Sequence, residues 1–519
     1  MVIIICPSAD THRTTEENLG AEYIVSFLRS RGVEVVFIDA WLCNLGNEDV
    51  LKIIKRVKHP VLVGLSVSMD SCISGNFLAQ RLKNLFPNVH ITIGGYKPTF
   101  SAEELLCSCS SIDSVCFGEG EFTILELYTA LSSKRDWKGT RGLIYLDEVG
   151  EVVRNEPRAL INNLDNLPFP SRDFIVIVRK KKTPVHISAS RGCYGNCAFC
   201  SINAFYGLCS GEKWRSRSIK NIIEEISILN KVYGVNSFKF VDDNFFSSKG
   251  ADLRVDEFCK LIKLKKLNIE FRISARANDV TEERFAKLKE AGLYSVSIGV
   301  ESGNQKSLDL FNKGIVVSRN YRAMKILRKL GIYVQMGFIL FNPLTDIESL
   351  VSDYKFLFAN KEAITKGIFS SLFLAEGTPI TDKFVKIGVT RRKSGSNYVY
   401  EPMDKKAAIV FRDLKLWATE NSALRDKVID PLSAPKIISE NLRPLFLVLC
   451  VRIKKYDLCV FNTILKMVCA GAGEKAVKEY VCGCIDTSAR FWQGISKEVN
   501  VLYSRAGIEY NAGRNKYII

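Results

Sequence analysis

Short apolar runs alternate with amphipathic stretches in the first part of the chain. The apolar runs have the length of buried strands and lie at Val2–Cys6, Val33–Ile38, Pro60–Val67, Val89–Ile93 and Ser114–Phe117. Between them, apolar positions recur at helical spacing in Ala21–Arg31, Asp49–Val57, Asn76–Leu85, Ala102–Leu106 and Phe122–Leu131. Strands that alternate with helices form a parallel sheet covered on both faces, so residues 1–135 are predicted to be a doubly wound, Rossmann-like domain.

Residues 136–184 break this alternation and are predicted to be a linker. Leu143–Leu146 and Glu151–Val153 flank Gly150 and are typical of a hairpin. Pro168 and Pro170 then favour a stiff, extended connector before the next apolar run.

Alternation resumes at Val185 and predicts a second α/β domain over residues 185–385. The apolar runs are Val185–Ser190, Ser237–Val241, Glu270–Ala275, Ser295–Val300, Tyr333–Leu340 and Ile368–Leu374. Six strand–helix units indicate a partial (β/α)6 TIM-type barrel, with functional residues at the carboxyl ends of its strands. Residues 386–519 lose the strand pattern and are predicted to be a mainly helical region that covers the barrel or shapes a substrate pocket.

Composition narrows the class of protein. At 519 residues and 47% hydrophobic content the chain can bury a large core, and no uncharged apolar stretch is long enough for a transmembrane segment. A cytoplasmic protein is therefore expected. The formal charge of +17 is spread along the chain, and no nucleic-acid module is apparent, so a nucleic-acid partner is not predicted.

Cys193, Cys197 and Cys200 are the only tight local set with loop character among 16 cysteines, and they follow an apolar run. Thiolates at C-x3-C-x2-C spacing bind iron–sulfur clusters, and Gly192 and Gly195 let a short loop wrap one. A zinc site is the alternative. Structural zinc is held by four ligands, and no fourth ligand is obvious nearby, so the cluster is favoured.

This loop, with Phe199 before the last cysteine, resembles that of radical S-adenosylmethionine (radical SAM) enzymes. The resemblance implies a 4Fe-4S cluster on the three cysteines, S-adenosylmethionine on its open iron, and Phe199 near the adenine. The stretches Ile93–Thr99 and Phe117–Glu121 resemble the cobalamin-binding domain fused to many of these enzymes. An ordinary Rossmann-like domain with glycine turns is the alternative there.

The resemblance also implies further cofactor-binding positions. On the cobalamin side these are Ser66, Ser68, Gly94, Gly95, Gly118, Glu119 and Gly120. On the S-adenosylmethionine side they are Asp242, Asp243, Ser274, Arg276, Glu301 and Ser302. Two alternatives stay open: the Asp–Asn pair at 243–244 as a helix cap, and Arg276 in an internal salt bridge with Glu301.

No histidine ligand to cobalt is expected. The motif that carries such a histidine is Asp-x-His-x-x-Gly, and Asp10-Thr11-His12 is followed by Thr15 where glycine is needed. Aligning the motif's glycine with Gly20 places Glu17 at the histidine position, where a carboxylate is a poor match for imidazole.

The family order of domains implies a cobalamin-dependent radical SAM enzyme. Its expected reaction is methylation of an unactivated carbon of a small-molecule, peptide or lipid substrate, through a 5′-deoxyadenosyl radical and methylcobalamin. An external electron donor such as flavodoxin or ferredoxin is implied. A non-methylating radical enzyme (cyclisation, oxidation or rearrangement) and a cobalamin or cluster sensor are the alternatives, and no catalytic residue is assigned.

Overall fold

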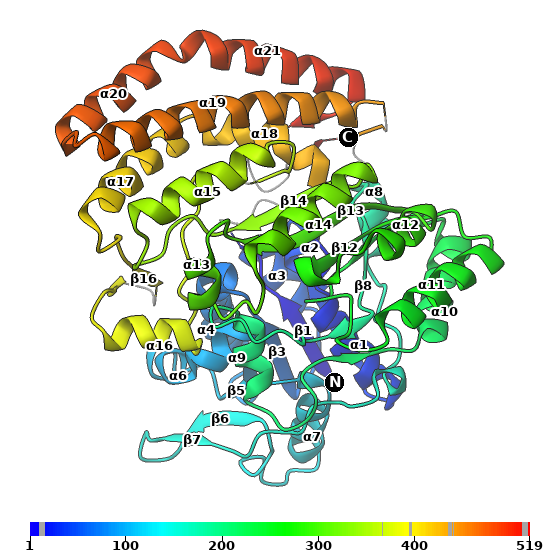
Figure 1. Cartoon of the computed structure of the whole chain (residues 1–519). Helices are drawn as coiled ribbons and strands as arrows, with labels where there is room; N and C mark the ends of the chain where they lie inside the picture. Colours follow the sequence, from blue (N-terminus) through cyan, green and yellow to red (C-terminus); the bar gives the residue numbers. More distant parts are fainter. Residues whose placement is uncertain are drawn as a thin grey trace.

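The computed structural model describes residues 1–9, 16–365, 367–393, 397–433, 438–439, 441–510 and 517–518 (Figure 1). Its N-terminal part is a seven-stranded sheet with the order β2-β1-β3-β4-β5-β6-β7. The strands are β1 (Val2–Cys6), β2 (Val35–Asp39), β3 (Leu62–Ser66), β4 (His90–Gly94), β5 (Ser114–Cys116), β6 (Leu143–Leu146) and β7 (Val152–Arg154). The five predicted parallel strands are confirmed, and the predicted hairpin, β6–β7, extends the same sheet by pairing antiparallel to β5.

Helices pack on both faces of this sheet, which explains why its strands are continuous apolar runs rather than alternating ones. All five residues of β1 are buried. The helices are α1 (Leu19–Ser30), α2 (Ala40–Cys43), α3 (Asn47–Ile54), α4 (Cys72–Leu85), α5 (Tyr96–Phe100), α6 (Ala102–Ser108) and α7 (Gly120–Ser132).

The second sheet has five parallel strands in the order β14-β13-β12-β11-β8. They are β8 (Val185–Ile187), β11 (Ser237–Phe240), β12 (Glu270–Arg276), β13 (Leu293–Glu301) and β14 (Tyr333–Phe338). The main crossover helices are α10 (Ile219–Tyr233), α11 (Ala251–Leu264), α12 (Glu282–Glu290), α14 (Val317–Lys329) and α15 (Ile347–Ala359). A two-stranded ribbon, β9 (Ser190–Arg191) with β10 (Arg215–Ser216), stands beside β8.

The predicted sixth strand is wrong. Residues Ile368–Leu374 are described, and they make only one isolated parallel bridge, between Phe341 and Ser371. Leu372 and Leu374 instead pack into a separate apolar cluster with Phe311 and α16 (Pro379–Lys386). An apolar run indicates burial, but burial against a helix needs no ladder of strand hydrogen bonds.

The C-terminal part is mainly helical, as predicted. The helices α17 (Lys405–Thr419), α18 (Ser422–Ser433), α19 (Arg443–Cys469), α20 (Glu474–Thr487) and α21 (Ala489–Ala506) lie along one side of the barrel, at the top of Figure 1. Phe411 of α17 packs on Phe341 of the barrel, with ring centroids 5.1 Å apart. Charged residues interrupt even the 27-residue α19, and none of the helices in the described ranges could cross a bilayer.

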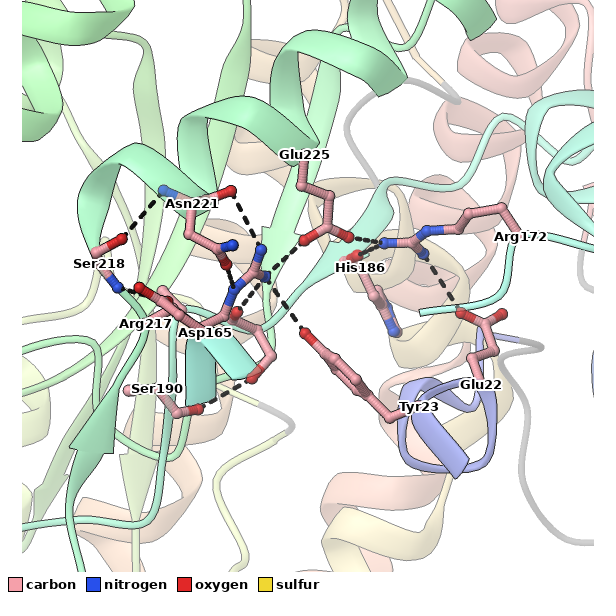
Figure 2. Close-up of polar contacts among 12 residues, drawn as sticks. Glu22, Tyr23, Asp165, Arg172, His186, Ser190, Arg217, Ser218, Asn221 and Glu225 are labelled. Atoms are coloured by element: carbon pink, nitrogen blue, oxygen red, sulfur yellow. Dashed lines mark hydrogen bonds and ion pairs between the residues drawn. The ribbon is translucent and has the colours of Figure 1, made fainter. Parts of the chain in front are cut away.

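Buried charges join the N-terminal sheet to the barrel (Figure 2). Arg172 donates to Glu17 at 2.9 Å and to Glu225 of α10 at 2.8 Å, and it lies 3.4 Å from Glu22 of α1. Glu225 also accepts from Arg217 at 2.5 Å. We call these five residues the Arg172 cluster; each of their side chains is at most 9% exposed.

Candidate functional site

The carboxyl ends of the two sheets border one cavity of about 330 Å³. Parallel α/β sheets bind ligands at this edge, so the cavity is the place where both halves of the chain are expected to work. The N-terminal part contributes Ser66, Gly94, Gly95, Gly118, Glu119 and Gly120, among others. The barrel side contributes Ser188, Ser190, Arg191, Phe205, Tyr206, Val241 and Asp243.

Two of the lining glycines are required by backbone geometry. Gly95 has φ +125°, and a Cβ there would lie 2.3 Å from the carbonyl oxygen of Val67. Gly118 has φ +78°, and its Cβ would lie 3.1 Å from Sγ of Cys209. Because neither glycine has a side chain, the backbone forms the wall at these two positions, which suits a large flat ligand such as a corrin.

The two predicted serines differ in position. Ser66 ends β3, lines the cavity and accepts a hydrogen bond from Asn18 at 3.3 Å. Ser68 is not among the residues lining this cavity; its backbone N–H donates to the Ser71 hydroxyl at 3.0 Å in the turn before α4. Only Ser66 therefore faces the space that a cofactor would enter.

Two of the three sulfurs of the cysteine loop accept a hydrogen bond from an N–H donor. The N–H of Gly195 donates to Cys193 Sγ at 3.3 Å, and Nη1 of Arg276 donates to Cys197 Sγ at 3.1 Å. At Cys200, burial raises the thiol pKa and backbone N–H groups at the start of α9 (Ser201–Gly207) oppose that rise. Hydrogen bonds of this kind stabilise thiolates and are a feature of iron–sulfur sites, so the three cysteines fit a cluster.

The zinc alternative would need a fourth ligand beside the three cysteines, because structural zinc is held by four converging ligands. The described side chains include no group of three or more His, Cys, Asp or Glu residues placed to hold a metal ion. The choice of a cluster over zinc therefore rests on the C-x3-C-x2-C spacing and not on the positions of the sulfurs.

The two adjacent aspartates after β11 face different ways. Asp242 is buried and accepts from the Ser190 hydroxyl and from the N–H of Ala189 at 3.1 Å. Asp243 lines the cavity and accepts from the N–H of Gly192 at 3.1 Å. Its side chain is exposed at the cavity surface; enclosure by the cavity walls, then the charge of Asp242, raise the pKa of Asp243 to about 7. The helix-cap alternative is wrong, because α11 begins after Gly250.

The salt bridge considered between Arg276 and Glu301 is not formed. Glu301 has the left-handed φ of +66°, and its carboxylate instead accepts from Lys313 Nζ at 2.8 Å. A buried non-glycine residue in this conformation is strained, and such strain gathers at functional sites. Ser302 is fully buried and donates to Asp353 at 2.7 Å, so its hydroxyl is engaged inside the protein.

Two further predicted residues, Ser274 and Phe199, do not line the cavity between the two sheets. Ser274 lines a neighbouring cavity of about 520 Å³, together with His186, Lys239 and Arg272. Phe199 packs edge-on against Phe311, with ring centroids 5.4 Å apart.

Sequence reasoning missed the partners of Glu119. Glu119 lines the cavity, and its carboxylate accepts from Arg191 at 2.9 Å and from Arg215 at 2.9 Å. It also accepts from the N–H of Ile161 at 2.7 Å, and Arg191 donates to Glu121 at 2.6 Å. We call Glu119, Glu121, Arg191 and Arg215 the Glu119 cluster. The only sequence signal for this cluster is the opposite charge of its members, because the residues that pair are about 70 to 96 positions apart in the sequence.

Glu17, the residue at the histidine position of the cobalt motif, is also engaged. Its carboxylate accepts from Arg172 and from the N–H of His186 at 2.7 Å. His12 lies outside the described residues. How cobalt would be ligated stays a prediction.

Comparison with known proteins finds two family matches, one in each of the two α/β parts of the chain. The profile of the radical SAM superfamily matches residues 187–357, and that of the B12 binding domain matches residues 8–127. An uncharacterized methyltransferase of Pyrococcus horikoshii is 35% identical over 346 residues, which are 66% of this chain and 73% of that protein. The anaerobic magnesium-protoporphyrin IX monomethyl ester cyclase of Rubrivivax gelatinosus is 28% identical over 375 residues, 69% of this chain and 66% of the cyclase.

A solved structure extends the likeness to the whole fold. The cobalamin-dependent S-adenosylmethionine radical enzyme OxsB, with aqua-cobalamin bound, superposes with a TM-score of 0.78 at 18% identity. The match covers 97% of this chain and 80% of that chain, so it includes the C-terminal helices.

Proposed function

The chain belongs to the B12-binding radical SAM enzymes, and we propose that it methylates an unactivated carbon of a small-molecule, peptide or lipid substrate. The observation that carries the proposal is the shared cavity. One wall of it comes from the glycine turns of the B12-binding domain, and the other comes from strand ends next to the cysteine loop. Methyl transfer between two cofactors requires them to meet in one space.

Different residues of the chain would bind the cluster, cobalamin and S-adenosylmethionine. Cys193, Cys197 and Cys200 would hold the cluster, and the bare turns at Gly95 and Gly118 would admit the corrin. When bound, the cluster supplies the electron that cleaves S-adenosylmethionine, and cobalamin carries the methyl group. Asp243, a carboxylate in the cavity wall, would hold the amino group of S-adenosylmethionine.

Contacts between the two halves would keep water away from reactive species. Tyr96 donates to the carbonyl oxygen of Glu376 at 2.8 Å, and Lys97 pairs with the Glu376 carboxylate at 2.9 Å. Both groups join α5 of the B12-binding domain to the turn before α16. Together with the Glu119 cluster, they fasten the domain to the barrel at two points near the cavity.

Radical ring closure without methyl transfer is the second candidate. The likeness to the magnesium-protoporphyrin IX monomethyl ester cyclase favours it, since that relative is 28% identical over 69% of this chain. Either reaction needs an external one-electron donor, of which flavodoxin and ferredoxin are the expected classes.

The deciding experiment is an anaerobic assay of the reconstituted protein with cobalamin, S-adenosylmethionine and a strong reductant. Mass spectrometry would quantify 5′-deoxyadenosine and S-adenosylhomocysteine. The Cys193, Cys197 and Cys200 to Ala triple variant should lose 5′-deoxyadenosine, whereas Cys259→Ala, a half-buried cysteine on α11, should retain it.

The two products separate the candidates. Formation of both supports methyl transfer, and 5′-deoxyadenosine alone supports the ring-closing or other non-methylating reaction. Neither product from protein with bound cluster and cobalamin would contradict both and favour a sensor.

A further inference from the structure

A single buried guanidinium touches the cysteine loop from the barrel. Nη1 of Arg276 lies 3.1 Å from Cys197 Sγ, and Nη2 donates to the carbonyl oxygen of Lys313. Arg276 is 9% exposed, and its Nε has no hydrogen-bond partner among the described residues. The side chain therefore reaches the loop at the cost of an incomplete set of hydrogen bonds.

No carboxylate neutralises this guanidinium within the described part of the chain. Asp279 is adjacent, but it accepts from the Arg276 backbone N–H at 3.2 Å and from the Tyr194 hydroxyl at 2.7 Å. Glu301 is occupied by Lys313. Burying a charge without a counter-charge is strongly unfavourable. The buried guanidinium of Arg276 therefore indicates that a negatively charged group binds beside it.

The cysteine loop leaves space for the Arg276 guanidinium at Gly195. A Cβ at Gly195 would lie 2.1 Å from Nη1 of Arg276, so any other residue there would displace it. The ring of Tyr194 lies 5.5 Å from the guanidinium on another side. Gly195 and Tyr194 both lie between Cys193 and Cys197 in the sequence, and neither is a predicted metal ligand.

From these contacts we propose that Arg276 is a positioning residue that sets the reduction potential of the cluster. Reduction adds one negative charge to the cluster and its thiolates, and a cation hydrogen-bonded to Cys197 favours that state. Arg276 would thus make the cluster easier for the external donor to reduce. The proposal rests on the proposed function only in taking the three cysteines as cluster ligands.

The test is a potentiometric titration of the reconstituted protein, followed by electron paramagnetic resonance, without S-adenosylmethionine, cobalamin or substrate. In Arg276→Met we expect the ratio of reduced to oxidised cluster at a fixed potential to fall about tenfold, which is about 59 mV for one electron. Arg276→Lys should keep most of the wild-type value, because it keeps the charge. Arg328→Gln, a half-exposed arginine on α14, should not change it.

Gly195→Ala gives a second test that leaves Arg276 in the chain. Its methyl group should push the guanidinium off Cys197 and lower the potential in the same direction as Arg276→Met. An unchanged midpoint potential in either variant, with full iron and sulfide content, would overturn the proposal. Because no product is measured, this result is independent of whether the enzyme transfers methyl groups.

Discussion

The Arg172 and Glu119 clusters both join the B12-binding domain to the barrel, but with opposite arrangements of charge. Arg172 sits among three carboxylates, those of Glu17, Glu22 and Glu225. Glu119 sits between two guanidinium groups. Burial and the charge of Glu17 hold the pKa of Glu22 well above its ordinary value, whereas Arg191 and Arg215 more than offset burial and lower the pKa of Glu119.

The two clusters also differ in their position relative to the cavity between the two sheets. Glu119, Glu121 and Arg191 line the main cavity, and there the two carboxylates and two guanidinium groups balance. Glu22 and Glu225 line neither that cavity nor the neighbouring one, and Glu17 lines only the neighbouring one. The excess of carboxylates therefore lies outside the cavity between the two sheets.

Removing the central arginine should have the largest effect. Arg172→Met removes the cation shared by three buried carboxylates, although Glu225 keeps Arg217 and Glu17 keeps the N–H of His186. It should cost about 3–5 kcal/mol of unfolding free energy. Chemical denaturation would measure it. Arg29→Met is the control, because its pair with Asp173 is about one-third exposed and is expected to contribute under about 1 kcal/mol. Equal losses in the two variants would refute the special role of the cluster.

Glu119→Gln should have a smaller effect, because Arg191 keeps its bond to Glu121. We expect a loss of about 1–3 kcal/mol from the buried hydrogen bonds to Arg215 and Arg191. Glu126→Gln, which removes a half-exposed partner of Arg158, is the matched control. The comparison would fail if Glu119→Gln lowered the denaturation midpoint no more than its control.

The smallest effect concerns pH, and its sign should differ between the clusters. Glu22 binds its proton more tightly in the folded protein, so its contribution to stability is lost as pH rises above the ordinary Glu value of about 4.3. The contribution of Glu119 is present above that value and lost as pH falls toward its lowered pKa.

Denaturation midpoints of the variants between about pH 2 and 8 would test both signs, because the window for Glu119 lies below the ordinary Glu pKa. Glu22→Gln should be less sensitive than the wild type to rising pH, and Glu119→Gln should be less sensitive to falling pH. Parallel pH profiles for wild type and both variants would show that the two clusters do not differ in this way.

Sequence patterns predicted the parts of the fold and site that depend on local spacing. The strand periods located the five parallel strands of the first sheet within about two residues, and the cysteine spacing identified the loop. Sequence patterns did not predict contacts between residues that are far apart in the sequence. Nothing local tells that Leu372 packs on a helix, or that Glu119 meets Arg191 and Arg215 rather than a ligand.

The arginines of both clusters come later in the chain than most of the carboxylates that they bind. During synthesis, residues 1–135 leave the ribosome before Arg172, Arg191 and Arg215, and N-terminal domains generally fold first. Glu22, Glu119 and Glu121 are thus made before the arginines that they contact in the folded protein. We expect docking of the barrel to be the step in biosynthesis at which these carboxylates lose their water, and a nascent chain halted before it to present them as an exposed acidic face.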